Sequence, residues 1–106
     1  MNYSKQKERS EIMKIKILSQ EYEVIEEKVI DRDGNLLGQV NLITNEISIC
    51  SDMPKEKKEI TLLHEILHAI LQQLAFHEEC DNENLISGLS TGIYQVLRDN
   101  KNLFTF

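Results

Sequence analysis

Hydrophobic and polar residues alternate through much of the first half of the chain. The clearest stretch is 46–50, where the second and fourth residues are isoleucines. The same spacing, with interruptions, runs through residues 14–30 and 36–43. Alternation of this kind is typical of strands with one buried face. We therefore predict strands in all three segments, with 14–30 forming one bent strand or two short ones.

Short segments of turn-forming residues separate these strands. Residues 31–35 contain Gly34 and Asn35, and the pair Thr44-Asn45 follows the next strand. Glycine and asparagine tolerate the positive φ angles that tight turns require. Strands joined by short turns pair antiparallel. The first half of the chain is therefore predicted to form a small three-stranded antiparallel meander.

The second half of the chain changes to a helical period. A second helix is predicted to end near Asp99 and to begin after Asp81 or Asn82, either of which can cap it. The fold class predicted is α+β, with the meander followed by two helices. The first helix is predicted over residues 54–75, where apolar residues recur three or four positions apart: Ile60, Leu63, Leu67, Ile70, Leu71 and Leu74.

The length of the chain, 106 residues, is enough for one small domain. Residues 1–12 are polar and lack a sustained apolar period, so they are predicted to form a polar N-terminal arm. Residues 13–106 are predicted to form the single domain. A chain of this size buries a modest share of its surface, which leaves little core for a second site.

Charge and composition narrow the classes of partner. The formal net charge of -6 disfavours nucleic acid and anionic membrane surfaces as partners. The chain has no run near the roughly 18 apolar residues of a membrane helix and no apolar segment of a secretory signal. We expect a cytoplasmic protein, in which Cys50 and Cys80 are unpaired thiols.

The first predicted helix contains the sequence His64-Glu65-Ile66-Leu67-His68. Residues four apart lie on one face of a helix, so both imidazoles can direct a ring nitrogen at one metal ion. Glu65 flanks the pair, where it can act as a general base on a zinc-bound water. The alternative is a polar stripe or a pair of hydrogen-bonded core histidines. Apolar residues enclose the motif, which favours the zinc site over a surface stripe.

A catalytic zinc of this kind needs a third protein ligand and leaves a fourth position for water. The metzincin pattern is excluded, because positions 71 and 74 hold leucines instead of glycine and histidine. The other common solution is a carboxylate that follows the helix. Glu83 is best placed, although the helix dipole alone also favours an acidic residue there. The other candidates are Glu78, Glu79, Asp81 and His77.

Three stretches of the chain resemble minimal gluzincin-like zinc metallopeptidases with an HExxH motif. They are GNLLGQVNLITNEISI, KKEITLLHEILHAIL and ENLISGLSTGIYQVLRDN. The likeness is to small domains of the ImmA/IrrE-like family and to their short phage-encoded relatives, and it covers roughly residues 14–100. Larger members of that family carry extensions that select a substrate, and this sequence has none.

The resemblance implies a ligand set and a mode of substrate binding. Carried over to this sequence, His64, His68 and Glu83 bind Zn²⁺, and Glu65 activates water. A protein or peptide substrate binds as an extended strand, against an edge formed by residues 36–43 or by residues 47–50.

Two functions are compatible with these features. The first is a hydrolase, a zinc-dependent metallopeptidase that cleaves a peptide bond in a protein of the cytoplasm, or of the host cytoplasm if a phage encodes the chain. The second is a non-catalytic modulator of the phage-encoded kind, which binds a protein through the same fold. The small size favours this alternative, and the sequence leaves the oligomeric state open.

Overall fold

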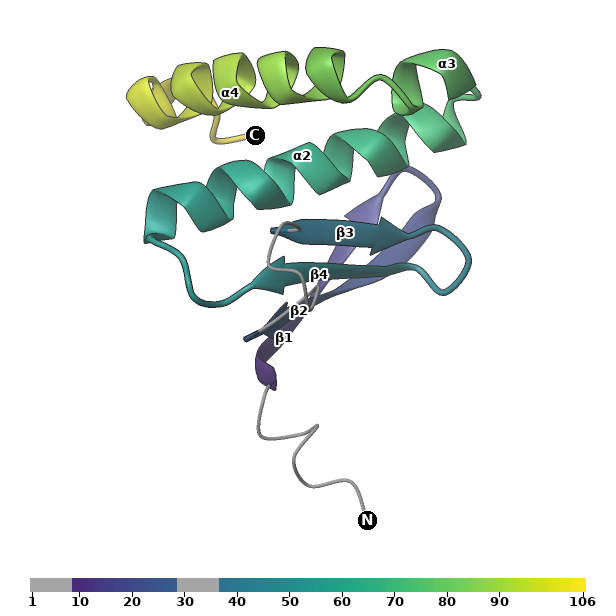
Figure 1. Cartoon of the computed structure of the whole chain (residues 1–106). Helices are drawn as coiled ribbons and strands as arrows, with labels where there is room; N and C mark the ends of the chain where they lie inside the picture. Colours follow the sequence, from purple (N-terminus) through teal and green to yellow (C-terminus); the bar gives the residue numbers. More distant parts are fainter. Residues whose placement is uncertain (1–8, 29–36) are drawn as a thin grey trace.

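The computed structural model describes residues 9–28 and 37–106 (Figure 1). The predicted turn at 31–35 and residues 1–8 of the predicted arm lie outside them. The bounds of α2 and α4 agree with the two predicted helices to within two residues at each end. The elements are β1 Arg9–Ile17, β2 Gln20–Glu27, β3 Gly38–Asn41, β4 Glu46–Cys50, α2 Lys55–Gln73, α3 His77–Cys80, α4 Glu83–Asp99 and the 3-10 helix η1 Lys101–Leu103.

The four strands form one mixed sheet in the order β1-β2-β4-β3. β1 pairs antiparallel with β2, and β3 pairs antiparallel with β4. The two central strands, β2 and β4, run parallel. The prediction of a three-stranded antiparallel meander is therefore wrong in strand number, in strand order and in the direction of the central pair. The prediction of an α+β chain with the strands first is correct in outline.

The first cause of this error is the turn at Leu18-Ser19, which separates β1 from β2 within residues 14–30, a segment predicted to form one bent strand or two short ones. β1 also begins at Arg9, inside the predicted N-terminal arm. Leu18 has a φ of 53°, a conformation that leucine rarely adopts. Gln73 at the end of α2 stabilises the turn. Its side-chain oxygen accepts a hydrogen bond from Ser19 N at 3.2 Å, and its Nε2 donates to the Ile17 carbonyl at 2.7 Å. No local sequence signal marks a turn that a residue 54 positions away holds in place.

The second cause is the position of β4 in the sheet. Short connections favour a meander in which the last strand lies at an edge, but β4 lies between β2 and β3. Ile47 is paired with Val24 on one side and with Val40 on the other. Its exposed fraction is 0%. Full burial of an isoleucine stabilises the folded state by about 1.5–3 kcal/mol. The strand order that places β4 at the centre is therefore favoured because it buries Ile47 completely.

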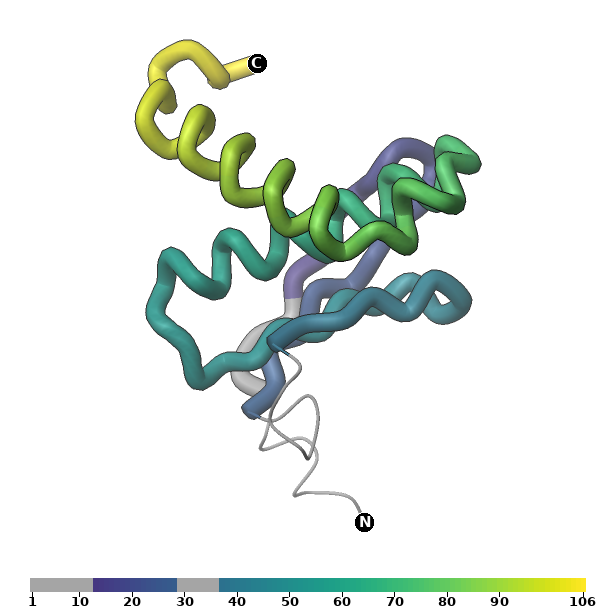
Figure 2. The backbone as a smooth tube through the Cα atoms, turned by 45° about the horizontal axis from the view of Figure 1, so that its top comes forward, coloured from purple at the N-terminus to yellow at the C-terminus, as the bar shows by residue number. Residues whose placement is uncertain are grey.

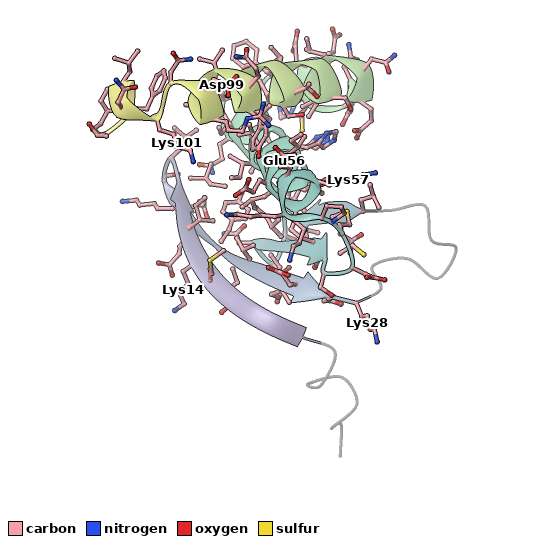
Figure 3. All side chains as sticks on the ribbon, turned by 90° about the vertical axis from the view of Figure 1, so that its left-hand side faces the viewer. Lys14, Lys28, Glu56, Lys57, Asp99 and Lys101 are labelled. Carbon is pink, nitrogen blue, oxygen red and sulfur yellow. The ribbon has the colours of Figure 1, made fainter. Side chains whose placement is uncertain are left out.

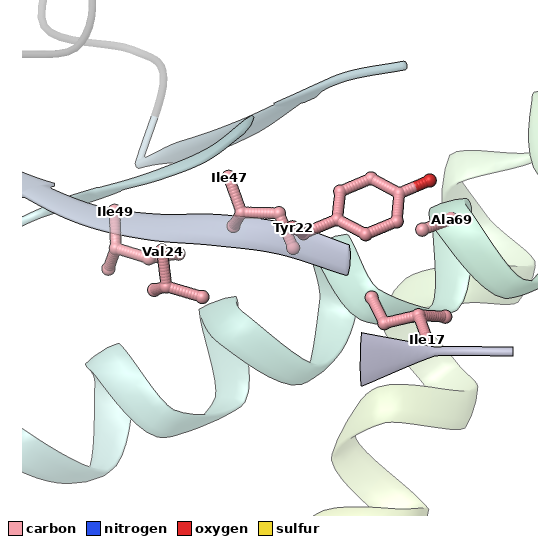
Figure 4. Packing of buried hydrophobic residues seen from close by; sticks show 6 residues of the cluster. All are labelled: Ile17, Tyr22, Val24, Ile47, Ile49 and Ala69. Atoms are coloured by element: carbon pink, nitrogen blue, oxygen red, sulfur yellow. The ribbon is translucent and has the colours of Figure 1, made fainter. Parts of the chain in front are cut away.

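The hydrophobic core lies between one face of the sheet and α2 (Figure 4). Alternate residues of a strand point to the same face, so the apolar positions of three strands share it. The buried members are Ile17, Tyr22, Val24, Ile47 and Ile49 from the sheet and Ala69 from α2. The small side chain of Ala69 allows α2 to pack closely on the sheet.

Helix α2 is the middle layer of the molecule, with the sheet on one side and α4 on the other (Figures 1 and 2). This position explains why apolar residues occur on more than one face of α2. In contrast, the described residues cover α4 on one face only. Ile86 and Ser90 of α4 are buried, whereas Leu85, Leu89 and Val96 are 37–44% exposed.

Two polar contacts join the beginning of α2 to the end of α4. Arg98 Nη1 donates to Glu56 Oε2, and the Tyr94 hydroxyl donates to Glu59 Oε1 at 2.7 Å. Glu56 lies on the first turn of α2, below α4 in Figure 3. These contacts hold the two helices together at the end that lies far from the histidines.

Strand β3 approaches α2 closely at Gly38. A Cβ atom at this position would lie 2.7 Å from Thr61 Cγ2, which is shorter than any normal contact. Glycine therefore lets the edge of the sheet reach α2 one turn before His64. Among the described residues, none of the helices is long and apolar enough to cross a membrane.

Candidate metal centre

One face of α2 lines an open cleft of about 970 Å³. Thr61, His64, Glu65 and His68 lie on this face, because their spacing of three and four residues brings them into one row. The face that packs on the sheet is a different one and includes Ala69. The helix thus separates its polar chemistry from its core residues.

The start of α4 brings Glu83 to this row. Asn82 caps the helix, and its side-chain oxygen accepts a hydrogen bond from Leu85 N at 3.1 Å. Glu83 is therefore the first residue of α4. The sequence left Asp81 and Asn82 as alternative caps, and the structure has Asn82 in this position. A short connection that contains α3 turns the chain back from the end of α2, so that the beginning of α4 lies over His64 and His68.

The side chains of His64, His68 and Glu83 converge on one point. His64 Nε2 lies 2.8 Å from Glu83 Oε1, and His68 Nε2 lies 3.1 Å from Glu83 Oε2. The centroids of the two imidazole rings are 5.0 Å apart. One ligand atom from each of the three residues lies within 4.8 Å of the others. The same atoms can share hydrogen bonds or turn toward one cation.

This set of donor atoms fits zinc. Imidazole nitrogens and carboxylate oxygens bind zinc at about 2.0–2.2 Å, so two ligand atoms of a tetrahedral site are about 3.3 Å apart. The distances of 2.8 and 3.1 Å join the two rings to different oxygens of Glu83, as hydrogen bonds do, and one ligand atom from each of the three residues lies within 4.8 Å of the others, so small side-chain rotations would bring them to this spacing. Three protein ligands leave one position open, which is the pattern of catalytic zinc sites and not of structural ones.

Glu65 lies in the same cleft and is 7% exposed. Burial raises the pKa of Glu65 above its ordinary value of 4.5, and the negative charge of Glu83 adds to this effect. His64 and His68 act in the opposite direction, because positive charge on their rings would stabilise the carboxylate. A buried carboxylate with a raised pKa is a stronger base than an exposed one, which suits it to accept a proton from water.

The other candidate ligands lie apart from the cluster. Glu78 and Glu79 are exposed residues of α3. His77 Nδ1 lies 3.4 Å from Gln72 Oε1, on the outside of the connection. Asp81 lines the cleft but does not join the three converging side chains. Over residues 9–28 and 37–106, the geometry therefore favours Glu83 among the carboxylates that the sequence left open.

Strand β3 forms the opposite wall of the cleft and one edge of the described sheet. The carbonyl of Leu37 accepts a hydrogen bond from Cys50 N, and the carbonyl of Asn41 accepts one from Asn45 N. The backbone groups of Leu37 and Asn41 therefore face the β4 side. Backbone groups alternate in direction along an antiparallel strand. The N–H and C=O groups of Gly38 and Val40 therefore point away from β4, to the side on which the described residues form no further strand.

The sequence predicted Cys80 only as an unpaired thiol and gave no indication that it contacts His68. Cys80 is 5% exposed, and its Sγ lies 3.8 Å from His68 Nδ1. Burial raises the pKa of the Cys80 thiol, and the charges of Asp81 and Glu83 raise it further. The expectation that Cys50 and Cys80 are unpaired thiols is confirmed. No local signal connects Cys80 with His68, because the turn at α3 brings them together.

The chain matches no known protein-family model, no curated protein sequence and no solved structure. The chemistry of this cleft is therefore argued from its own residues.

Proposed function

We propose that the chain is a zinc-dependent metallopeptidase of the gluzincin type. The observation that carries this proposal is the convergence of His64 Nε2, His68 Nε2 and the Glu83 carboxylate beside the buried Glu65. Zinc bound by these three residues would supply Lewis acidity, which polarises a peptide carbonyl and makes water more acidic.

Glu65 is the proton carrier in this proposal. Its carboxylate accepts a proton from a water molecule in the cleft, and the resulting hydroxide attacks the peptide carbonyl carbon. When the carbon–nitrogen bond breaks, the same carboxyl group donates the proton to the departing amine. The raised pKa of Glu65 supports both steps, because catalysis by proton transfer is most efficient when the pKa is near the working pH.

The substrate proposed is an extended segment of a protein, bound beside β3. The backbone groups of Gly38 and Val40 would pair with it as a further strand, a known mode of peptide recognition. Of the two edges that the resemblance suggested, residues 47–50 belong to the central strand β4, so we assign this role to β3. The free thiols of Cys50 and Cys80 support a reducing compartment, and we propose the cytoplasm.

The decisive experiment replaces Glu65 with glutamine. Glu65→Gln keeps the size of the side chain and removes its ability to accept a proton. We expect the variant to bind one zinc ion per chain, measured by elemental analysis. Its hydrolysis of unfolded casein or of a quenched fluorescent peptide library should fall by about 10²- to 10⁴-fold.

The matched control is Glu78→Gln, the same change at an exposed residue of α3. This variant should keep both zinc and hydrolysis. Equal activity of the Glu65→Gln variant and the parent would show that Glu65 is not the proton carrier and that the proposed mechanism is wrong. A parent protein that binds no zinc would exclude the proposal altogether.

A second candidate function is that of a non-catalytic protein-binding modulator. The observation that favours it is the outer face of α4, where Leu85, Leu89 and Val96 are 37–44% exposed beside Gly88 and Gly92. A Cβ atom at either glycine would have nothing within 4 Å among the described residues. A protein complex that survives both chelation of zinc and Glu65→Gln, with no cleavage of the bound protein, would support this function over the first.

A further inference from the structure

Cys80 makes two contacts with the same histidine. Its Sγ donates to the main-chain carbonyl of His68 at 3.3 Å and lies 3.8 Å from Nδ1 of the His68 ring. The thiol is almost completely buried at the end of α3. It is therefore enclosed against α2 at the level of the candidate metal centre.

The two ring nitrogens of His68 face different partners. Nε2 points to Glu83, at 3.1 Å, and Nδ1 points to Cys80. A neutral imidazole carries its proton on one nitrogen and has a free lone pair on the other. Neutral His68 can give the Nε2 lone pair to zinc only when Nδ1 carries the proton, and an acceptor for that proton fixes the tautomer and the orientation of the ring.

We propose that Cys80 is a positioning residue for His68, in which the thiol donates its hydrogen to the His68 carbonyl and its sulfur accepts the Nδ1–H. This arrangement uses both capacities of one thiol and sets the ring so that Nε2 faces the metal. The proposal rests on the proposed zinc centre.

The same contact also places the third ligand. Cys80 is three residues before Glu83, at the point where the connection turns toward α4. Fixing Cys80 on the backbone of α2 fixes the start of α4 relative to His64 and His68. One buried side chain thus orients one ligand and positions the segment that carries another.

The test compares Cys80→Val, which fills a similar volume without hydrogen bonding, with Cys80→Ser. The serine Oγ can still donate to the His68 carbonyl but reaches less far than sulfur toward Nδ1. Zinc affinity is measured by competition with a chelator. We expect a loss of about 10-fold for Cys80→Val, the lower end of the effect of such partners of metal ligands, and a smaller loss for Cys80→Ser. Cys50→Val is the matched control and should bind zinc as the parent does.

A second measurement separates positioning from packing. In the zinc-loaded parent, the Nδ1–H proton of His68 should give an NMR signal that exchanges slowly with water. In Cys80→Val this exchange should be faster, even if the free energy of unfolding measured in chelator is unchanged. Without zinc, a difference in the free energy of unfolding between Cys80→Val and the parent reports the packing of residue 80 and not metal binding.

The possible results distinguish this inference from the proposed function. Parent-like zinc affinity and slow Nδ1–H exchange in Cys80→Val would overturn the role of Cys80 and leave the zinc centre intact. Parent protein without zinc would overturn both. If zinc binding depends on Cys80 and Glu65→Gln keeps full activity, the positioning role of Cys80 is supported and the proposed mechanism of hydrolysis through Glu65 is excluded.

Discussion

The two ends of the α2–α4 helix pair are held by different kinds of contact. We call them the histidine end, where Glu83 meets His64 and His68, and the far end, where Arg98 and Tyr94 of α4 meet Glu56 and Glu59 of α2. At each end, carboxylate oxygens bind two donors on the other helix. The pattern is the same, but the donors differ in what else they can bind.

At the far end the donors, Arg98 and Tyr94, are not expected to bind a metal ion in place of the carboxylates. Arg98 keeps its charge at any ordinary pH and has no lone pair to give to a metal, and its guanidinium also lies 5.4 Å from the centre of the Tyr94 ring. At the histidine end the Nε2 atom of each ring can bind either a proton or a metal ion. The far end therefore only fixes the distance between the helices, whereas the histidine end can respond to zinc.

Burial separates the donors of the two ends but not the carboxylates. The side chains of His64 and His68 are 19% and 12% exposed and that of Arg98 is 42% exposed, whereas Glu83 and Glu56 are both 66% exposed. Contacts between exposed charges contribute little to stability, because water screens them. We infer that the helix pair is held weakly at the far end and that a metal ion would add its stabilisation at the histidine end.

The largest expected effect is the response of stability to zinc. An ion that binds only the folded protein should raise the free energy of unfolding by about 4 kcal/mol when free zinc is 1,000 times Kd. Glu83→Ala should lose most of this gain, since removing a ligand should weaken binding beyond the roughly 10- to 100-fold loss seen for partners of ligands. Urea unfolding in buffered zinc and in chelator measures the difference.

Arg98→Ala is the control for this experiment at the far end. It removes a contact between the same two helices but leaves all three candidate ligands in place. Its stability in chelator should fall slightly, and its gain on adding zinc should equal that of the parent. If Arg98→Ala lost as much of the zinc response as Glu83→Ala, the division between the two ends would be wrong.

The histidine end is the part of the molecule that sequence reasoning described best. The spacing of His64 and His68, the cap at Asn82 and the short connection between the helices all depend on residues close together in the chain. These local rules placed Glu83 at the start of α4, and the three side chains do lie together. Binding of zinc by them stays a prediction.

The sheet and the support of the histidines could not be predicted in the same way. The turn between β1 and β2 depends on Gln73, and the parallel pairing of β2 with β4 depends on which strand is buried most completely. Cys80 meets His68 only after the connection has folded back on α2. Each feature joins segments that are distant in the sequence or turned by a loop, and residue periodicity carries no information about such contacts.

A smaller effect is expected from the pH dependence of stability at the histidine end. Because burial raises the pKa of Glu65, the folded protein holds this proton more tightly than the unfolded chain. The contribution of Glu65 to the free energy of unfolding is fully present below the ordinary pKa of 4.5, and it is lost as the pH rises through the pKa of the folded state. In chelator, the parent should therefore lose stability with rising pH relative to Glu65→Gln.

Urea unfolding of the parent and of Glu65→Gln at a series of pH values above and below 4.5 gives this difference, in which groups that do not interact with Glu65 cancel. Glu78→Gln, at an exposed carboxylate, should show no such trend relative to the parent. A difference between parent and Glu65→Gln that stays constant with pH, or that changes in favour of the parent as pH rises, would contradict the prediction.

The smallest expected effect is a shift in the ionisation of Tyr94 at the far end. The hydrogen bond from its hydroxyl to Glu59 raises the pKa of Tyr94 above the ordinary value of 10.0, because the phenolate cannot donate that bond and is repelled by the carboxylate. Absorbance titration, with Tyr94→Phe to identify the signal, should show Tyr94 ionising above that value. Glu59→Ala should return it toward 10.0, whereas Glu83→Ala should leave it unchanged. An identical titration in Glu59→Ala and the parent would mean that this hydrogen bond does not link the helices in solution, and the far end would then be held by Arg98 and Glu56.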